Sequence, residues 1–186
     1  MLEWTEIEIE GDLALRLVAG PAGIRAIRFG RNGGPADGER NDANPLLVEA
    51  ARQLRAYFDG SARDFSLPLD MIGTDFQKRV WRELLAIPYG ETRSYAAVAA
   101  AIGSPRGVRA VGAANGVNPI PIVVPCHRVI GSGGRLVGYG GGLALKKRLL
   151  ELERRVAQQE RDQGVARGRG RSPHRGALKA DSRQLS

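Results

Sequence analysis

Cysteine is almost absent from this chain of 186 residues: Cys126 is the single cysteine, and only two histidines are present. One cysteine cannot form a disulfide within the chain and cannot build a cysteine-rich zinc site. Residues 1–72 hold neither Cys nor His, so we expect no metal there. A free thiol survives in a reducing compartment, which predicts a cytoplasmic protein.

Long apolar runs are also missing. No stretch reaches the roughly eighteen apolar residues of a membrane span, and no charged-then-apolar leader opens the chain. We therefore expect no membrane partner. Aromatic residues make up only 5%, but an apolar content of 42% is enough for a globular core. The length allows one domain or two small ones.

Acidic charge is scarce in the second half of the chain. Residues 1–72 carry 8 Lys+Arg and 12 Asp+Glu, residues 73–156 carry 13 and 5, and residues 157–186 carry 7 and 3. This asymmetry indicates a polyanion partner for the second half. A solvated basic surface without a partner explains the charge equally well.

A small α+β support domain is predicted for residues 1–72. Three segments alternate apolar and polar side chains, as strands with one buried face do. Turn residues at 11–12 and 20–23 separate them, so we expect a three-stranded antiparallel sheet. The expected strands are 6–10, 13–17 and 24–29.

One helix should cover that sheet. Asn44 is a candidate N-cap with Pro45 at the first helical position, and Gly60 should end the helix. Residues 31–42 are expected to be a loop, and 65–69 a short strand or an extended linker. No cluster of reactive side chains is evident here, which favours a supporting role.

Residues 73–158 are predicted to be mostly helical. Thr74 and Gln77 form a capping box that starts the first helix. Two short helices, 95–102 and about 106–115, follow, and a turn with glycine joins them as in a helix-turn-helix.

The end of the chain is expected to change character. A helix is predicted from Leu143 to about Gln158. Residues 159–186 contain Arg-Gly repeats without periodicity and are predicted to be a disordered basic tail.

Small side chains dominate the second short helix, where a major-groove reader would carry Asn, Gln or Arg. They allow close approach to a wide, flat partner. Tight contact between helices in a core is the alternative. The small residues are Gly107, Ala110, Gly112, Ala113 and Ala114.

Cys126 follows a short apolar stretch, 120–124, bracketed by prolines. This stretch is predicted to be a buried extended segment that delivers the thiol rigidly. His127 and the positive charge of Arg128 favour a thiolate. Adjacent side chains on a straight strand point opposite ways, so Cys126 and His127 cooperate only if the chain turns or a water bridges them. For such a dipeptide in general, a buried structural cysteine beside a surface histidine is the alternative.

The string Pro-Cys-His-Arg-Val at 125–129 resembles the active-site motif of the methylated-DNA–protein-cysteine methyltransferases, the 6-O-alkylguanine-DNA alkyltransferases of the Ogt type. Asn118-Pro119, Tyr139 with its following glycines and Glu153 match the family as well. The resemblance is detailed from about 74 to 153 and only architectural before. It implies an α+β N-terminal domain followed by a winged-helix-like C-terminal domain.

The resemblance implies catalytic roles at the matching positions. Cys126 would accept the alkyl group, and Glu153 would orient His127, which takes the thiol proton. Tyr95 would help guanine to leave, and Asn118 would tie the strand end to the helix-turn-helix. Taken alone, Tyr95 could be an ordinary core aromatic and Glu153 a solvated charge.

The implied partner is double-stranded DNA, bound through its minor groove by a monomer, with cooperative binding left open. Arg109 would enter the duplex and fill the gap left by the target nucleotide. A phosphate-contacting or solvated arginine is the alternative. The predicted DNA-binding residues are Ser94, Tyr95, Gly107, Arg109, Ala110, Gly112, Arg128 and Ser132.

Two glycine-rich loops, 131–134 and 138–142, flank the thiol. A phosphate-binding role is weakly supported, because no Gly-Lys-Ser/Thr follows. Loops without side chains can instead line a pocket for a flat ring. The predicted pocket residues are Val129, Tyr139 and Gly140. Family members often have serine at Gly140, so a more permissive pocket is our hypothesis here.

The implied reaction is stoichiometric, irreversible alkyl transfer from 6-O-alkylguanine to Cys126 after base flipping, without a cofactor. Whether 4-O-alkylthymine is also a substrate stays open. Two alternatives remain. A lesion-recognition protein would not need Cys126, and a cysteine hydrolase with a Cys-His-Glu triad would turn over and would not need a helix-turn-helix.

Overall fold

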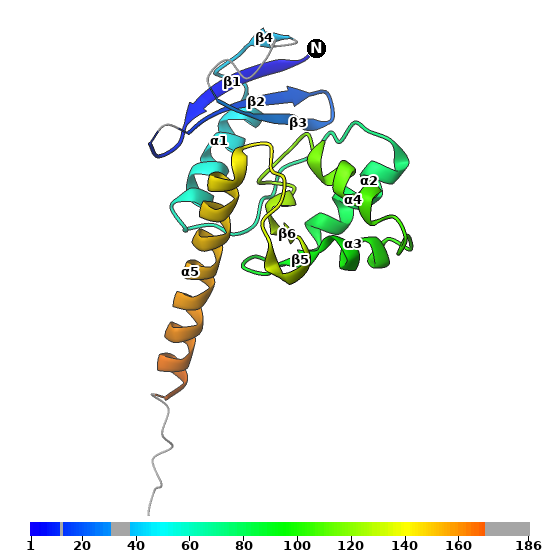
Figure 1. Cartoon of the computed structure of the whole chain (residues 1–186). Coiled ribbons are helices and arrows are strands. Elements are labelled where there is room, and N and C mark those ends of the chain that lie inside the picture. The colour runs from blue at the N-terminus through cyan, green and yellow to red at the C-terminus, as the bar shows by residue number, and fades with distance from the viewer. Residues whose placement is uncertain (12, 31–37, 170–186) are drawn as a thin grey trace, which may run out of the picture.

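The structure is a computed structural model that describes residues 1–11, 13–30 and 38–169, with side chains up to residue 162. An N-terminal sheet with its helix lies beside a group of short helices, and a long final helix starts beside the first part and extends beyond it (Figure 1). One cluster of buried apolar side chains continues through both parts, from Leu15 and Leu17 to Val111 and Val124. The two halves are therefore held against each other by shared apolar burial.

The N-terminal sheet has four strands. They are β1 (Glu3–Glu8), β2 (Ala14–Gly20), β3 (Gly23–Phe29) and β4 (Glu39–Arg40). Their order is β3-β2-β1-β4, and the first three pair antiparallel as predicted. β4 pairs parallel to β1, so the expectation of a loop over all of 31–42 is wrong at its end. A two-residue strand leaves no alternation to detect. Residues 31–37 of that expected loop lie outside the described residues.

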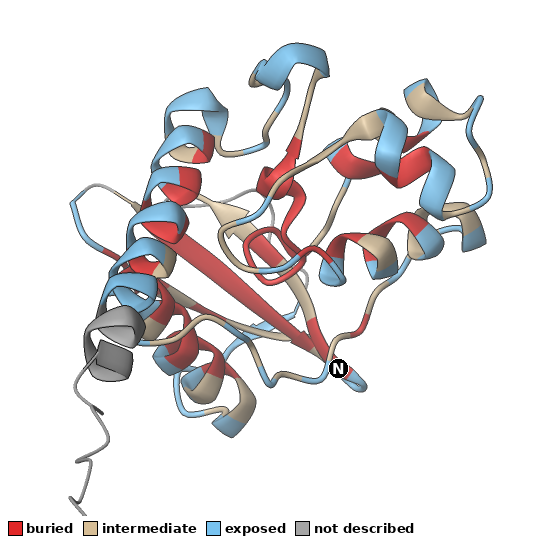
Figure 2. Ribbon diagram, turned by 90° about the horizontal axis from the view of Figure 1, so that it is seen from below, coloured by how far each residue is buried: buried red, intermediate tan, exposed pale blue. Residues whose placement is uncertain are grey.

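Helix α1 (Pro45–Phe58) covers the sheet and starts as predicted. The Asn44 side chain accepts the backbone N–H of Leu46 at 2.9 Å and of Leu47 at 3.1 Å. Gly60 follows the helix with φ of 81°, where a side chain would be strained. Figure 2 shows buried residues on the strands and on the inward faces of the helices that pack against them.

The linker from the sheet to the helices is extended and lies against the start of β3. Leu69 forms an isolated bridge with Ile24, and the Ile24 N–H donates to the Pro68 carbonyl at 2.8 Å. Of the two alternatives for 65–69, the structure matches the extended linker.

The second part contains the predicted helix-turn-helix. Helix α2 (Asp75–Leu85) begins with the predicted Thr74 capping box. Helices α3 (Tyr95–Ala101) and α4 (Val108–Gly116) pack on each other, and Gly103 turns between them with φ of 72°. A small parallel sheet of β5 (Arg93–Ser94) and β6 (Val129–Ile130) joins the start of α3 to the cysteine segment.

Helix α5 (Gly142–Arg169) is longer than predicted. The expected disordered tail is therefore wrong for residues 159–169. The part of α5 beyond Gln158 begins with the charged residues Glu160, Arg161 and Asp162. A charged segment can continue a helix without the apolar stripe by which a sequence predicts one. Residues 170–186 of the expected tail lie outside the described residues. Among the described helices, none is long and apolar enough to cross a membrane.

Candidate active site

Cys126 is presented by tight turns and not by a strand. The segment 120–124 is buried as expected, but the Val124 N–H donates back to the Ile120 carbonyl at 2.9 Å. Ile122 has φ of 75°, a strained value for a β-branched residue. The expected extended segment is thus wrong. Its flanking prolines offer no N–H to a ladder, so the segment closes on itself.

Two further turns follow at the cysteine. Pro125, with φ −80° and ψ 62°, is the centre of an inverse γ-turn in which the Cys126 N–H donates to the Val124 carbonyl at 2.8 Å. A 3₁₀ turn, Cys126–Arg128, comes next, and the Arg128 N–H donates to the Pro125 carbonyl at 3.0 Å. The chain therefore turns at the place where cooperation of Cys126 with His127 requires it.

Asn118 fixes these turns from the end of α4. Its Nδ2 donates to the Val124 carbonyl at 2.8 Å, and its Oδ1 accepts the Ile120 N–H at 3.0 Å. Asn118 thus ties the cysteine segment to the helix-turn-helix through both polar atoms of its side-chain amide.

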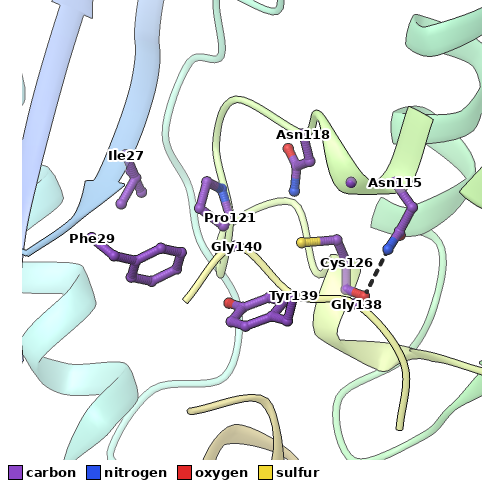
Figure 3. Close-up of a pocket in the computed structure, with 10 residues that line it drawn as sticks. Ile27, Phe29, Asn115, Asn118, Pro121, Cys126, Gly138, Tyr139 and Gly140 are labelled. Atoms are coloured by element: carbon purple, nitrogen blue, oxygen red, sulfur yellow. Dashed lines mark hydrogen bonds between the residues drawn. The ribbon is translucent and has the colours of Figure 1, made fainter. Parts of the chain in front are cut away.

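The Cys126 thiol faces a cavity of about 170 Å³. Figure 3 shows the sulfur pointing into this space, with Ile27 and Phe29 of β3 across from it. Tyr139 and Gly140, two of the three predicted pocket residues, line the cavity, whereas Val129 is buried in β6 and is not among the lining residues. The lining residues are Ile27, Phe29, Asn115, Gly116, Asn118, Pro121, Cys126, Gly138, Tyr139 and Gly140.

The wall contributed by β3 is aromatic. The Phe29 and Tyr139 rings lie 5.6 Å apart between centroids, and a Cβ built on Gly140 would lie 3.9 Å from Phe29. The N-terminal part therefore supplies one side of the cavity and does more than support it. Alternation in β3 predicts a strand but says nothing about which partner its side chains meet.

A buried cluster of polar side chains lies behind the thiol. His127 Nε2 is 2.7 Å from Glu153 Oε1, and both side chains are fully buried. The Tyr57 hydroxyl of α1 donates to the same oxygen at 2.6 Å and lies 3.3 Å from His127 Nε2. His127 Nδ1 is buried without a hydrogen-bond partner among the described atoms. The ring therefore has one anchored nitrogen and one that is available to exchange a proton.

Burial and hydrogen bonding set the charges of these groups. Burial raises the pKa of the Cys126 thiol to about 11 and lowers the pKa of His127, so at rest we assign a thiol beside a neutral imidazole. Burial opposes ionisation of Glu153, but hydrogen bonds from His127 and Arg128 hold its pKa at about 2. The carboxylate is the fixed charge of the cluster.

Arg128 is an interior residue, which corrects its assignment as a DNA contact. Its Nε donates to Glu153 Oε2 and its Nη2 donates to Glu153 Oε1, both at 3.0 Å. Its Nη1 donates to the Ile87 carbonyl at 2.7 Å. The residue is 7% exposed. Its guanidinium balances the buried carboxylate, and all three of its nitrogens donate to groups inside the protein.

The other predicted DNA-binding residues lie around α3, α4 and the loop after β6. Arg109 and Ala110 are exposed on α4, and Ser132 is exposed in the loop. The Ser94 hydroxyl accepts the Ala97 N–H at 3.1 Å, so it caps α3. Gly107 is the N-cap residue of α4.

Tyr95 lies between the two short helices. A Cβ on Gly112 would stand 3.9 Å from its ring, which places the ring against α4. Burial raises the pKa of Tyr95, as does the nearby Cys126. Its hydroxyl therefore remains a donor close to the thiol.

Sequence reasoning missed Tyr57, Lys146, Ile27 and Phe29. Tyr57 lies three residues after Leu54, on the apolar face of α1. In α5, Lys146 lies three residues before Leu149 and seven before Glu153, on the same face of the helix. A polar group on the buried stripe of a helix was the signal that could have found both. Lys146 Nζ donates to the Val129 carbonyl at 2.7 Å and the Val137 carbonyl at 2.8 Å, bridging β6 to the glycine-rich loops.

Two family models match the chain. Residues 15–71 match the 6-O-methylguanine DNA methyltransferase, ribonuclease-like domain, and residues 75–155 match the DNA binding domain of the same family. Among the described residues, no group of three or more His, Cys, Asp or Glu side chains could hold a metal ion.

Relatives with high identity carry the same family name. The chain is 59% identical over 111 residues to a methylated-DNA–protein-cysteine methyltransferase of Mycobacterium leprae, covering 60% of this chain and 67% of that protein. It is 62% identical over 105 residues to the protein of that name from Mycobacterium tuberculosis H37Rv, covering 56% of this chain and 64% of that protein. These alignments thus span about two thirds of the relatives.

A solved structure agrees over a longer range. The structure of Mycobacterium tuberculosis OGT in complex with DNA matches with a TM-score of 0.75 and 46% identity, covering 83% of this chain and 94% of that chain. The α+β sheet region and the helical region are both included in that range. The chain belongs to the 6-O-methylguanine-DNA methyltransferase family.

Proposed function

We propose that this protein repairs DNA by moving the alkyl group of a 6-O-alkylguanine onto Cys126. One observation carries the proposal: the thiol points into a cavity, and the adjacent His127, anchored by Glu153, has a buried Nδ1 without a partner among the described atoms. A nucleophile, a base and a group that orients the base are the parts that covalent catalysis requires. The DNA-bound relative and the basic second half support duplex DNA as the partner.

The proton passes from the thiol to His127. The resting thiol has its pKa raised to about 11, so a base must take its proton as the reaction begins. His127 Nδ1 is that base, and we assign one bridging water to carry the proton from Cys126. The imidazolium that forms is stabilised by the Glu153 carboxylate.

The thiolate then attacks the alkyl carbon in line. The bond from that carbon to the guanine 6-oxygen breaks as the carbon–sulfur bond forms, and guanine leaves with the electron pair. Tyr95 protonates or hydrogen-bonds the departing ring, and backbone N–H groups of 138–142 face the developing charge at the oxygen. The thioether is not reversed by thiol exchange, so each molecule acts once.

The target base has to leave the duplex. An alkyl group on guanine is out of reach of a buried thiol while the base stays stacked. In the proposal α4 lies in the minor groove, its exposed small residues allow close approach, and Arg109 fills the vacated position. The protein acts as a monomer in the reducing cytoplasm, where the thiol stays free.

The decisive experiment follows both partners by intact mass and peptide mass. The protein is mixed with excess duplex that carries one 6-O-methylguanine, and a second duplex carries 4-O-methylthymine. We expect one methyl on the Cys126 peptide, with repaired DNA equal to protein, and the Cys126→Ala variant should bind the duplex but gain no methyl. Unmodified protein that still binds the lesion would favour recognition alone, and product in excess over protein would favour a hydrolase.

A further inference from the structure

We propose that Tyr57, which lies in the N-terminal half of the chain, is a positioning residue that sets the protonation of His127; this inference rests on the proposed alkyl transfer. Tyr57 is 1% exposed and belongs to α1, far in sequence from the cysteine motif. Its hydroxyl reaches Glu153 at 2.6 Å and His127 Nε2 at 3.3 Å. Among the described hydrogen bonds, Tyr57 is thus the one residue of α1 that contacts both His127 and Glu153.

The first step of the argument concerns the tautomer of His127. The Tyr57 hydroxyl has one proton, and that proton goes to Glu153 Oε1. Toward His127 the phenol oxygen can then only accept. Two acceptors, a carboxylate oxygen at 2.7 Å and a phenol oxygen at 3.3 Å, therefore face Nε2, which must carry the hydrogen. Nδ1 is left as the basic nitrogen of the neutral ring.

The second step concerns the strength of the base. Each hydrogen bond that Glu153 accepts disperses its negative charge, so the Tyr57 proton weakens the pull of Glu153 on imidazolium. Burial, together with the neighbouring carboxylate, raises the pKa of Tyr57 far above its ordinary value, so the phenol stays a donor at any working pH. Tyr57 thereby keeps His127 neutral and ready to accept the thiol proton. Other titratable or charged groups around His127 are Cys126, Arg128, Tyr89, Tyr139 and Lys146.

Removal of the Tyr57 hydroxyl should therefore change the pKa of His127 in a direction that a loss of packing alone does not predict. In Tyr57→Phe, Glu153 attracts the imidazolium proton more strongly, and the pKa of His127 rises. The acid limb of the transfer rate should move to higher pH by about half a unit to one unit. On the acid limb, below the pKa of His127, that shift should slow transfer by about threefold to tenfold, and the parent's rate should return at higher pH, while affinity for duplex DNA stays unchanged.

Tyr89→Phe is the matched control. The Tyr89 ring meets the Tyr57 ring edge-on at 5.9 Å, and its buried hydroxyl has no hydrogen-bond partner among the described atoms. That variant also loses one buried hydroxyl near Arg128 but no hydrogen bond to Glu153. A second variant changes Tyr57 in the opposite direction: 3-fluorotyrosine at this position is a stronger donor and should move the acid limb to lower pH.

The experiment measures single-turnover methyl transfer over the range in which histidine titrates, and the His127 ring by ¹⁵N NMR in the same variants. Only two histidines are present, which makes the ring signals simple to assign. An upward shift in Tyr57→Phe, with Tyr89→Phe equal to the parent, supports the proposal. An unshifted limb in Tyr57→Phe, or equal shifts in both variants, overturns it. If the parent transfers no methyl, the proposed function falls, and the NMR titration of His127 still decides the role of Tyr57.

Discussion

The backbone N–H of Ile27 donates to the carbonyl oxygen of Pro119 at 2.9 Å. This bond ties the free edge of β3 to the segment that carries the thiol, which lies far along the chain. β3 is the outer strand of its sheet, so the bond satisfies its edge at Ile27, beyond the point at which Leu69 bridges Ile24. It also places Ile27 and Phe29 in the wall of the cavity, which makes the N-terminal part a component of the site.

The first prediction concerns the size of the alkyl group. Phe29→Ala should enlarge the cavity next to Tyr139, so that bulky groups such as benzyl gain about tenfold in rate relative to methyl. Gly140→Ser should act in the opposite direction, because a side chain there approaches Phe29, the nearest atom to its Cβ at 3.9 Å. Competition between 6-O-methylguanine and 6-O-benzylguanine duplexes measures the ratio.

The matched control for this pair is Phe29→Leu, which keeps most of the apolar volume and should keep the parent's ratio. Phe29→Ala should cost about 1–3 kcal/mol of unfolding free energy, since the side chain is only half-buried. A benzyl-to-methyl ratio that is the same in all variants would show that β3 does not limit the substrate.

The second prediction separates the role of Arg109 from general charge. Arg109→Ala should slow transfer from a paired lesion by about tenfold or more, because the gap in the duplex is left unfilled. Arg106→Ala removes an equal charge from an exposed position just before α4 and should only weaken binding, with a smaller salt slope. Single-turnover rates at saturating duplex distinguish the two effects.

A lesion opposite an abasic site sharpens this test, because its base is already poorly held. The deficit of Arg109→Ala should shrink on that duplex. Equal deficits on both duplexes would contradict the role of Arg109 in base flipping.

Local signals in the sequence predicted those elements that local chemistry determines. Asn44 and Thr74 each cap the helix expected of them, because a cap is a bond between near neighbours in the chain. The two-residue strand β4 was missed because its pairing with β1 is not encoded in its own residues. The form of 120–124 also depended on long-range contacts, since apolar residues there suit a strand and a buried turn equally.

The site was predictable to the extent that a linear motif carries it. His127 and Glu153 lie within hydrogen-bond distance, Asn118 holds the cysteine segment, and Cys126, Tyr139 and Gly140 line one cavity. Arg128 was wrongly predicted to contact DNA, because an arginine beside a reactive thiol is expected at the surface as long as its buried partner, Glu153, is not known. Tyr57 and Phe29 come from another part of the chain, and their roles arise only when the two halves pack together.

The third prediction tests the interior position of Arg128. Arg128→Met should lower the free energy of unfolding by about 3–5 kcal/mol, because it leaves the Glu153 carboxylate buried without its main partner. Urea unfolding measures this loss. Affinity for duplex DNA in the folded fraction should stay at the parent's value, whereas Arg135→Met, an exposed loop arginine, should leave stability unchanged. The reverse pattern would restore Arg128 as a DNA contact.

The fourth prediction concerns stability in acid. The pKa of Glu153 is about 2 in the folded protein against an ordinary 4.5, so its ionised form stabilises the fold fully above pH 4.5 and this contribution is lost as pH falls toward 2. His127 acts in the same direction. Burial lowers its pKa below the ordinary 6.5, so the unfolded chain binds that proton first as the pH falls through 6.5. We therefore expect the urea midpoint to decline in two stages on acidification.

Because Glu153→Gln cannot titrate, it should lack the lower stage and start from a lower midpoint. The decline near pH 6.5 belongs to His127 and should be absent from His127→Phe, which keeps a ring in the buried position. A single decline that both variants retain would assign acid unfolding to groups outside this cluster.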